Sequence, residues 1–208
     1  KVENFEEAIQ ENTKAIFIES LGNPKLDVLD IEAIAKVAQA NQIPLIVDNT
    51  VASPSLLNPI KHGANLVIHS LTKYIAGQGN SLGGIVIDAG TFDWASGKFP
   101  EFTEPSKGYH GLIYAEALGE AAFITKLRIE GLRDYGGALS PLSAFQIIQG
   151  LETLEVRIKQ HSKNALELAE WLESLEEVAW VNYPGLKNNK YYPLSQKYLP
   201  KGQSGIVT

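Results

Sequence analysis

The feature that most constrains the fold is a series of four short apolar runs in the first half of the chain. They cover residues 15–19, 43–47, 66–69 and 85–87, and their apolar side chains occupy consecutive positions rather than alternating ones. Such runs suit β-strands that are covered on both faces, as in a parallel sheet between helices. The sequence therefore predicts a mainly parallel sheet as the centre of the chain.

Helical patterns separate these runs. Over residues 29–38 the apolar side chains recur with a period close to that of an α-helix, and Asp27 is expected to cap the N-terminus of this helix. A shorter helix is expected over residues 55–62. The order strand, helix, strand, helix, strand predicts an α/β fold in which helices flank the sheet.

The next part of the chain is expected to be mostly helical. Residues 90–111 mix aromatic side chains with glycine and proline and show no period, which indicates an ordered surface insertion. Helices are expected over residues 112–132 and 141–175, and the second has Ser140 as its N-cap and Pro141 at its first position. A helix as long as the second one is expected to bend or to bridge two domains.

The domain organisation is expected to change within this long helix. A strand pattern over residues 178–181 follows it, and residues 205–208 have the composition of another strand. We therefore expect a large domain over residues 1–155 and the start of a smaller C-terminal α/β domain over residues 156–208. Because the chain begins without methionine or a signal-peptide pattern, we expect it to be an internal fragment of a longer protein.

Composition argues against several classes of function. The chain has 24 acidic and 18 basic side chains and a formal net charge of −6, so its surface as a whole would repel nucleic acid and anionic membranes. Its apolar runs are shorter than the roughly 18 residues of a membrane span. Cysteine is absent, which excludes disulfides and thiolate chemistry. We expect a cytoplasmic protein with neither a nucleic-acid nor a membrane partner.

The residues most suited to chemistry follow two of the expected strands. Asp48 comes at the end of the second run, and Lys73 lies in a polar segment directly after the third. Ligands of open α/β sheets bind beyond the carboxyl ends of the strands, so Asp48 and Lys73 would face one ligand. A lysine in such a crevice can form a Schiff base with an aldehyde. The hydroxyls of Ser70 and Thr72 would bind a phosphate, and the carboxylate would keep a pyridine nitrogen protonated.

These segments resemble a known family. Residues 47–50 read V-D-N-T, residues 70–74 read S-L-T-K-Y, and a glycine-rich stretch follows over residues 77–84. In combination they closely resemble the Cys/Met-metabolism family of fold-type I pyridoxal-phosphate (PLP) enzymes. The resemblance implies that Lys73 forms the Schiff base with PLP and that Asp48 pairs with the pyridine nitrogen. It also implies that Ser70 and Thr72 bind the cofactor phosphate, and that residues 1–155 form part of the PLP-binding domain.

Two further stretches extend the resemblance. Residues 19–24 read E-S-L-G-N-P, which implies that Asn23 lies beside the phenolic oxygen of PLP, although an ordinary turn before Pro24 explains the same residues. Segments between residues 132 and 186 look most like the O-acetylhomoserine sulfhydrylase branch. That branch implies γ-replacement on O-acetyl-L-homoserine, in which sulfide or a thiol displaces acetate and homocysteine forms, and a homodimer or homotetramer.

Other interpretations stay open. The same family contains cystathionine γ-synthases and γ-lyases, so a different acceptor or an elimination is an alternative, as is a catalytically incomplete fragment. Residues 70–73 also match the S-x-x-K signature of serine acyl-transferases, but the S-D-N and K-T-G motifs of those enzymes are absent from the chain. The glycines of residues 77–83 are spaced one residue too widely for a dinucleotide-binding fingerprint, and a strand follows them.

Histidines and arginines are expected to have structural roles. No histidine has the spacing to carboxylates that indicates a metal site, so no metal is expected; the four are His62, His69, His110 and His161. The arginines are expected in salt bridges or on helix surfaces; they are Arg128, Arg133 and Arg157.

Overall fold

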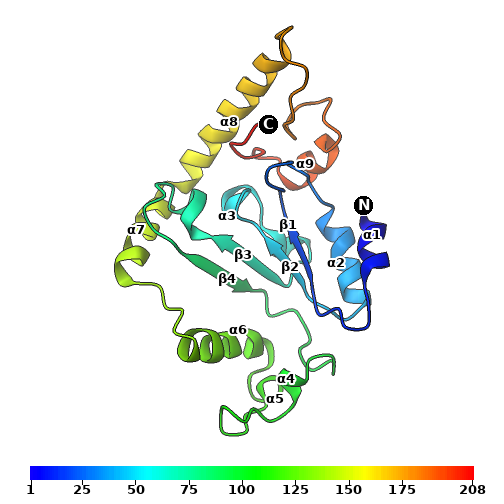
Figure 1. Cartoon of the computed structure of the whole chain (residues 1–208), viewed down its shortest axis with the longest axis vertical. Helices are drawn as coiled ribbons and strands as arrows, with labels where there is room; N and C mark the ends of the chain where they lie inside the picture. Colours follow the sequence, from blue (N-terminus) through cyan, green and yellow to red (C-terminus); the bar gives the residue numbers. More distant parts are fainter.

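The computed structural model describes residues 1–208 and has a four-stranded sheet at its centre (Figure 1). The strands are β1 (Ile16–Glu19), β2 (Leu45–Asp48), β3 (Leu66–Ser70) and β4 (Gly84–Asp88), and they are ordered β1-β2-β3-β4. The pairs β1–β2 and β2–β3 are parallel, whereas β4 runs antiparallel to β3. The predicted α/β fold with a mainly parallel sheet is confirmed, and its four strands fall where the apolar runs placed them.

The helices before β3 differ from the expected ones in their bounds. They are α1 (Val2–Ala8), α2 (Ile31–Ala40), α3 (Ser53–Leu56) and a 3₁₀ helix (Pro59–His62). Asp27 is not the N-cap of α2: Asp30 caps it, accepting a 3.2 Å hydrogen bond from Ala33 N, and Asp27 instead accepts one from the Tyr191 hydroxyl at 2.6 Å. The helix expected over residues 55–62 is divided into two pieces. The second piece begins at Pro59, because a proline inside a helix cannot donate a backbone hydrogen bond.

The long helix is interrupted. It consists of α7 (Pro141–Glu152) and α8 (Leu154–Glu173), and Thr153 between them has φ −106° and ψ 4°. The predicted cap is confirmed, since Ser140 Oγ accepts a 3.1 Å hydrogen bond from Ser143 N. The helix expected over residues 112–132 is broken into short turns, which include α5 (Tyr114–Leu118), α6 (Ala122–Lys126) and a π-helical segment (Leu127–Asp134).

Neither strand expected near the C-terminal end is present. The segments 178–181 and 205–208 are irregular, and they flank α9 (Tyr192–Tyr198). A single pair joins them: Asn182 N donates to Thr208 O at 2.6 Å and Thr208 N donates to Asn182 O at 3.2 Å. A strand needs a ladder of such bonds, so one exchanged pair leaves the segments irregular.

The main core lies on one face of the sheet. It contains 27 buried residues, which come from that face, from α2 and from α7 and α8. The C-terminal segment joins the same core through Tyr183, Leu186 and Leu199. The domain boundary at residue 155 therefore stays a prediction. The prediction that β1 is covered on both faces is wrong. One face is buried through two isoleucines, but Phe17 between them is 57% exposed on the other face.

A second, aromatic core organises the insertion expected over residues 90–111. It lies below the sheet in Figure 1, around α4 (Pro100–Thr103), α5 and α6. Trp94 stacks on Phe102 and on Phe123, with ring centroids 4.5 and 4.9 Å away, and the buried Leu66 of β3 connects this core to the sheet. No helix combines the length and the apolar composition that crossing a membrane requires.

Candidate active site

A cavity of about 660 Å³ lies where β1, β2 and β3 reach their carboxyl ends. Its lining includes Asp48 from the end of β2, Ser70 from the end of β3, and both Thr72 and Lys73 from the turn that follows. Asn23, from the loop after β1, lines it as well. The structure therefore brings all five residues singled out in the sequence to one cavity, whose size is ordinary for a small-ligand site.

Parallel pairing sets the position of Asp48. It is the register partner of Glu19 on β1, and both carboxylate side chains line the cavity. Asp48 Oδ1 accepts a 2.9 Å hydrogen bond from Thr50 N. The Thr50 hydroxyl oxygen in turn accepts from Ser70 N at 2.8 Å, which ties the end of β2 to the end of β3. Asp48 Oδ2 has no partner within the chain, so one carboxylate oxygen is oriented and available to a ligand.

Lys73 lies in a short π-helical turn (Leu71–Ile75) directly after β3. Its own backbone leaves the helical region, with φ −89° and ψ −127°, and its carbonyl accepts a 2.8 Å hydrogen bond from Gly77 N. The Lys73 side chain is exposed at the open side of the cavity. The primary amine of Lys73 is thus accessible to a small molecule in the cavity that Asp48 also lines.

The two predicted phosphate-binding hydroxyls differ in their surroundings. Thr72 Oγ1 accepts a 3.1 Å hydrogen bond from Gly83 N and donates to Gly83 O at 3.4 Å. The Ser70 hydroxyl makes no hydrogen bond with the rest of the chain. Ser70 therefore offers its full donor and acceptor capacity to a ligand, whereas Thr72 also fastens the glycine-rich loop before β4.

Asn23 belongs to a loop that is tied back to β1. Its backbone N donates to Glu19 Oε2 at 3.1 Å, and the peptide bond to Pro24 is cis. The Asn23 side chain is exposed at the rim of the cavity and its amide makes no hydrogen bond within the chain. The structure thus leaves this amide available to a ligand and also supplies the turn that the sequence suggested.

Several lining residues were not identified from the sequence. Tyr74 and Ile206 are among them, together with Arg157 and His161 of α8. The last two are four residues apart and so share one face of the helix. The ring of His161 lies 5.7 Å from that of Tyr74. The spacing of Arg157 and His161 was visible in the sequence, but the direction in which α8 presents them was not.

The arginines and His69 have distinct environments. Arg133 forms the expected salt bridge, to Asp134 at 2.9 Å. Arg157 is in neither a salt bridge nor a purely solvated position, because its guanidinium donates to backbone carbonyls. His69 is 4% exposed with Nδ1 unpartnered, and burial lowers the pKa of its ring. No group of three His, Asp or Glu side chains is arranged to hold a metal ion.

Comparison with known proteins identifies the family of the chain. Residues 1–208 match the family described as Cys/Met metabolism PLP-dependent enzyme. The O-acetyl-L-homoserine sulfhydrylase of Leptospira meyeri is 51% identical over 99% of this chain and 48% of its own length. The homocysteine/cysteine synthase of Kluyveromyces lactis is 48% identical over 100% of this chain and 48% of its own length.

A solved structure shares the fold. The putative O-acetylhomoserine (thiol)-lyase of Campylobacter jejuni, which contains N'-pyridoxyl-lysine-5'-monophosphate, superposes with a TM-score of 0.94 and 41% identity, covering 100% of this chain and 52% of that one. The chain thus spans about half the length of the relatives that it matches. Because the family match includes every residue, this chain belongs to the Cys/Met-metabolism family of PLP-dependent enzymes.

Proposed function

We propose that the full-length protein acts in the cytoplasm and converts O-acetyl-L-homoserine and sulfide, or a thiol, to homocysteine or its thioether by γ-replacement. The observation that supports this proposal is that an amine, a carboxylate and two hydroxyls line one cavity at the carboxyl ends of the strands. Relatives of the chain are named O-acetyl-L-homoserine sulfhydrylase and homocysteine/cysteine synthase, which supports this choice of reaction.

The residues present fit PLP. Lys73 would hold the aldehyde carbon of the cofactor through Nζ, and Asp48 would hold its pyridine nitrogen through the unpartnered Oδ2. Ser70 and Thr72 would bind the phosphate, and Asn23 would contact the phenolic oxygen. When bound, PLP supplies an electron sink for the electrons that a departing α-proton leaves behind. The hydrogen bond from Thr50 N to Asp48 Oδ1 would keep the carboxylate directed at the ring nitrogen.

Lys73 is also the proposed general base. A primary amine can accept a proton from carbon when it is held close to it, and the exposed Lys73 side chain has room to move within the cavity. Its Nζ would first take the α-proton of the substrate. Once Nζ has released this proton, it could take a β-proton, and acetate would then leave the γ-carbon. Sulfide or a thiol would add to the γ-carbon, and the β- and α-carbons would each regain a proton.

The charges around the cavity suit an amino-acid substrate. Two cationic side chains, Lys73 and Arg157, and two carboxylates, Glu19 and Asp48, line it together. Such a mixed lining supplies cations for a phosphate or a substrate carboxylate and carboxylates for a substrate ammonium group. A small-molecule amino acid is therefore the partner that we propose for this site.

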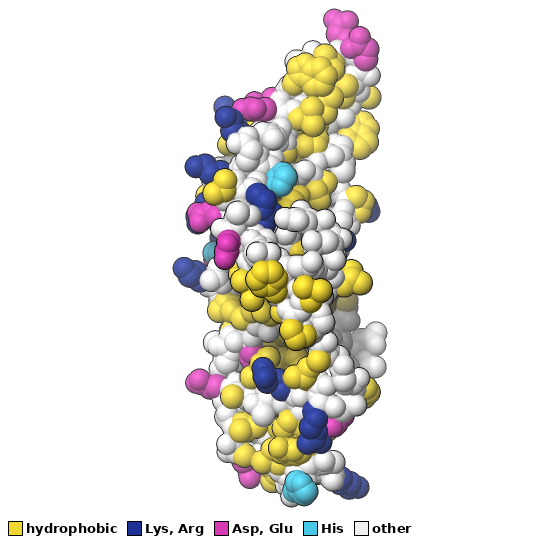
Figure 2. Space-filling view, turned by 90° about the vertical axis from the view of Figure 1, so that its left-hand side faces the viewer, with side chains coloured by type: hydrophobic (Ala, Val, Ile, Leu, Met, Phe, Trp, Pro, Cys, Tyr) yellow, Lys and Arg dark blue, Asp and Glu magenta, His cyan; other side chains and the backbone are white.

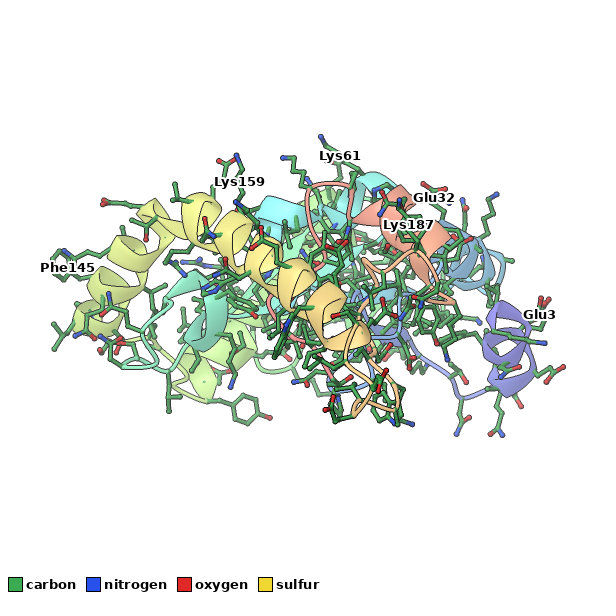
Figure 3. All side chains as sticks on the ribbon, turned by 90° about the horizontal axis from the view of Figure 1, so that it is seen from above. Glu3, Glu32, Lys61, Phe145, Lys159 and Lys187 are labelled. Carbon is green, nitrogen blue, oxygen red and sulfur yellow. The ribbon has the colours of Figure 1, made fainter.

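We also propose that the protein forms a homo-oligomer through α7. Four large apolar side chains at intervals of three residues point out of this helix: Leu142 (67% exposed), Phe145 (57%), Ile148 (57%) and Leu151 (48%). Apolar side chains gather on the side of the molecule that Figure 2 views, and Figure 3 shows Phe145 directed away from the fold. Exposed apolar side chains in this number on one helix are typical of a protein interface. Phe145→Glu is expected to lower the mass of the assembly in solution, and an unchanged mass would contradict this interface.

The decisive experiment uses the full-length protein. Homocysteine is to be measured after addition of O-acetyl-L-homoserine and sulfide, with cystathionine formation from cysteine and γ-elimination followed in parallel. A cystathionine rate above the homocysteine rate would overturn the proposed reaction but leave the PLP site intact.

The cofactor site is tested separately. The protein should be yellow near neutral pH, and borohydride should fix the cofactor mass on the peptide that contains Lys73. Lys73→Arg should abolish both the colour and the adduct. Lys61→Arg is the matched control, since Lys61 is exposed and lies outside this cavity. Protein that stays colourless after PLP is added would refute the proposal.

A further inference from the structure

Arg157 lines the cavity but directs most of its donors at the backbone. Its Nη1 donates to Tyr74 O at 2.8 Å, and its Nη2 donates to Ile75 O at 3.2 Å and to Gly150 O at 2.7 Å. Its Nε donates to Thr153 Oγ1 at 3.0 Å. A guanidinium has five N–H donors, so four of the five are already used. Arg157 is therefore arranged as a bridge rather than as a site for an anion.

The acceptors on one side of this bridge belong to the turn that carries Lys73. The last carbonyls of a helical turn have no backbone partner within it. Lys73 O is satisfied by Gly77 N, and the next two carbonyls, of Tyr74 and Ile75, are the ones that Arg157 reaches. The acceptors on the other side, at Gly150 and Thr153, lie at the interruption between α7 and α8. The bridge thus connects the lysine turn to the long helix.

Two glycines allow this close contact. Gly77 has φ +79°, and a Cβ built on it would lie 2.5 Å from Arg157 Nη1. A Cβ on Gly150 would lie 2.1 Å from Ala76 O. The segment after Lys73 is therefore held between α7 on one side and the guanidinium on the other, with no space for a side chain at either contact.

We infer that Arg157 is a positioning residue that fixes the backbone from which Lys73 reaches the cofactor site. The peptide unit between Tyr74 and Ile75 is the first that Arg157 holds, and it directly follows the unit at which Lys73 leaves the helical region. A rotation there would swing Nζ through the cavity. Arg157 keeps this unit in one orientation, and it leaves the binding of the substrate carboxylate to other groups. The kinetic part of this inference rests on the proposed function, whereas the structural part does not.

The test compares Arg157→Lys with Arg128→Lys in the full-length protein. A lysine has three N–H donors on one nitrogen and cannot reproduce four hydrogen bonds that leave from three nitrogens, so most of the bridge is lost although the charge stays. In cofactor-free protein, the amides of Ala76 and Gly77 should exchange hydrogen at least tenfold faster than in the wild type. The Arg128 side chain is exposed and makes no hydrogen bond, so in the Arg128→Lys variant the amides of Ala76 and Gly77 should exchange at the wild-type rate.

The cofactor-bound protein supplies the second readout. Displacing a reacting group by about 1 Å can lower a rate by about 100-fold, so kcat of Arg157→Lys should fall by roughly 10- to 100-fold with KM for the amino-acid substrate nearly unchanged. The pH at which the yellow absorbance titrates should also shift. A raised KM with unchanged kcat and unchanged exchange would overturn the inference, because it would make Arg157 a substrate-binding group.

Two controls keep the outcomes separate. If Arg157→Lys does not fold, Thr153→Val removes the acceptor for Nε, together with the 3.3 Å hydrogen bond from Thr153 Oγ1 to Gly150 O, and should show a smaller change of exchange in the same direction. Wild-type exchange in that variant would then refute the bridge. If the wild type binds no PLP, the proposed function fails, and the exchange of Ala76 and Gly77 in cofactor-free protein still decides the role of Arg157.

Discussion

The hydroxyl of Ser20 donates a 2.8 Å hydrogen bond to Asn49 Oδ1, and both side chains are buried. Asn49 Nδ2 donates in turn to the carbonyls of Ser53 and Leu57, at 3.1 and 2.9 Å. One amide therefore joins the end of β1, the end of β2 and the turn that contains α3. Because Asp48 directly precedes Asn49, this network also holds the backbone of the carboxylate that faces the cavity.

Asn49→Ala is expected to be strongly destabilising. It removes three hydrogen bonds and leaves buried polar groups without partners, which we estimate to lower the free energy of unfolding by about 2–4 kcal/mol. Asn12→Ala is the matched control, since Asn12 is exposed and its side chain makes no hydrogen bond. Denaturant unfolding monitored by circular dichroism measures both. Equal stabilities would show that the network does not support the strand ends.

Gly150→Ala is expected to move α7 away from the lysine turn. The added methyl group would overlap Ala76 O, at 2.1 Å, and neither backbone can yield without shifting its element. Overpacking of this kind typically costs about 1–3 kcal/mol, and the backbone contact places Gly150 at the upper end. Gly108→Ala is the control, because a Cβ there meets open space. Thermal unfolding of the pair of variants provides the comparison, and equal midpoints would contradict the close contact.

The sheet and the residues at the strand ends were predictable because their signals are local. Asp48 and Lys73 are polar residues that directly follow apolar runs, and parallel strands bring their carboxyl ends together. The cap of α2 was placed three residues too early, at Asp27, because two aspartates precede the helix and local preference does not separate them. Tertiary contact separates them: the Tyr191 hydroxyl binds Asp27.

The missed parts of the site depend on contacts between distant segments. Arg157 reaches Tyr74 across 83 positions of sequence, and no pattern near either residue indicates the contact. The interruption at Thr153 has no proline to mark it. The strand pattern over residues 178–181 failed for a related reason, because a strand requires a partner along its length and Asn182 has only one paired neighbour, Thr208.

The aromatic core of the insertion is expected to unfold separately from the main core. Trp94 is 5% exposed and stacks on two phenylalanines, so Trp94→Ala should lower stability by about 3–5 kcal/mol within that core. Trp180→Ala, at a side chain that is 71% exposed, should have little effect. Hydrogen exchange should rise in α5 and α6 of the first variant but not in α2. A uniform rise throughout the chain would show that the two cores unfold together.

Stability is expected to fall as the pH drops below about 6.5 because of His69. Burial lowers the pKa of this ring, so the unfolded chain binds a proton that the folded protein does not. The stabilisation is therefore fully present above about pH 6.5 and is lost as the pH falls, with a limiting slope of about 1.4 kcal/mol per pH unit for one proton. The free energy of unfolding at a series of pH values measures the slope. His69→Asn should flatten it, whereas His110→Asn, at an exposed ring, should leave it unchanged.

Mutation of the two hydroxyls proposed to bind phosphate should have different effects on stability. The Ser70 hydroxyl has no partner in the chain, so Ser70→Ala should weaken PLP binding by about tenfold, the equivalent of one hydrogen bond to a charged group, and leave the stability of cofactor-free protein unchanged. Thr72→Val should weaken PLP binding too, but it also removes the acceptor of Gly83 N and should destabilise the cofactor-free protein by about 1 kcal/mol. Equilibrium dialysis with PLP and unfolding of the cofactor-free protein give the two quantities. If Thr72→Val lowers affinity without lowering stability, the hydrogen bonds to Gly83 do not hold the loop, and Thr72 would act on the phosphate alone.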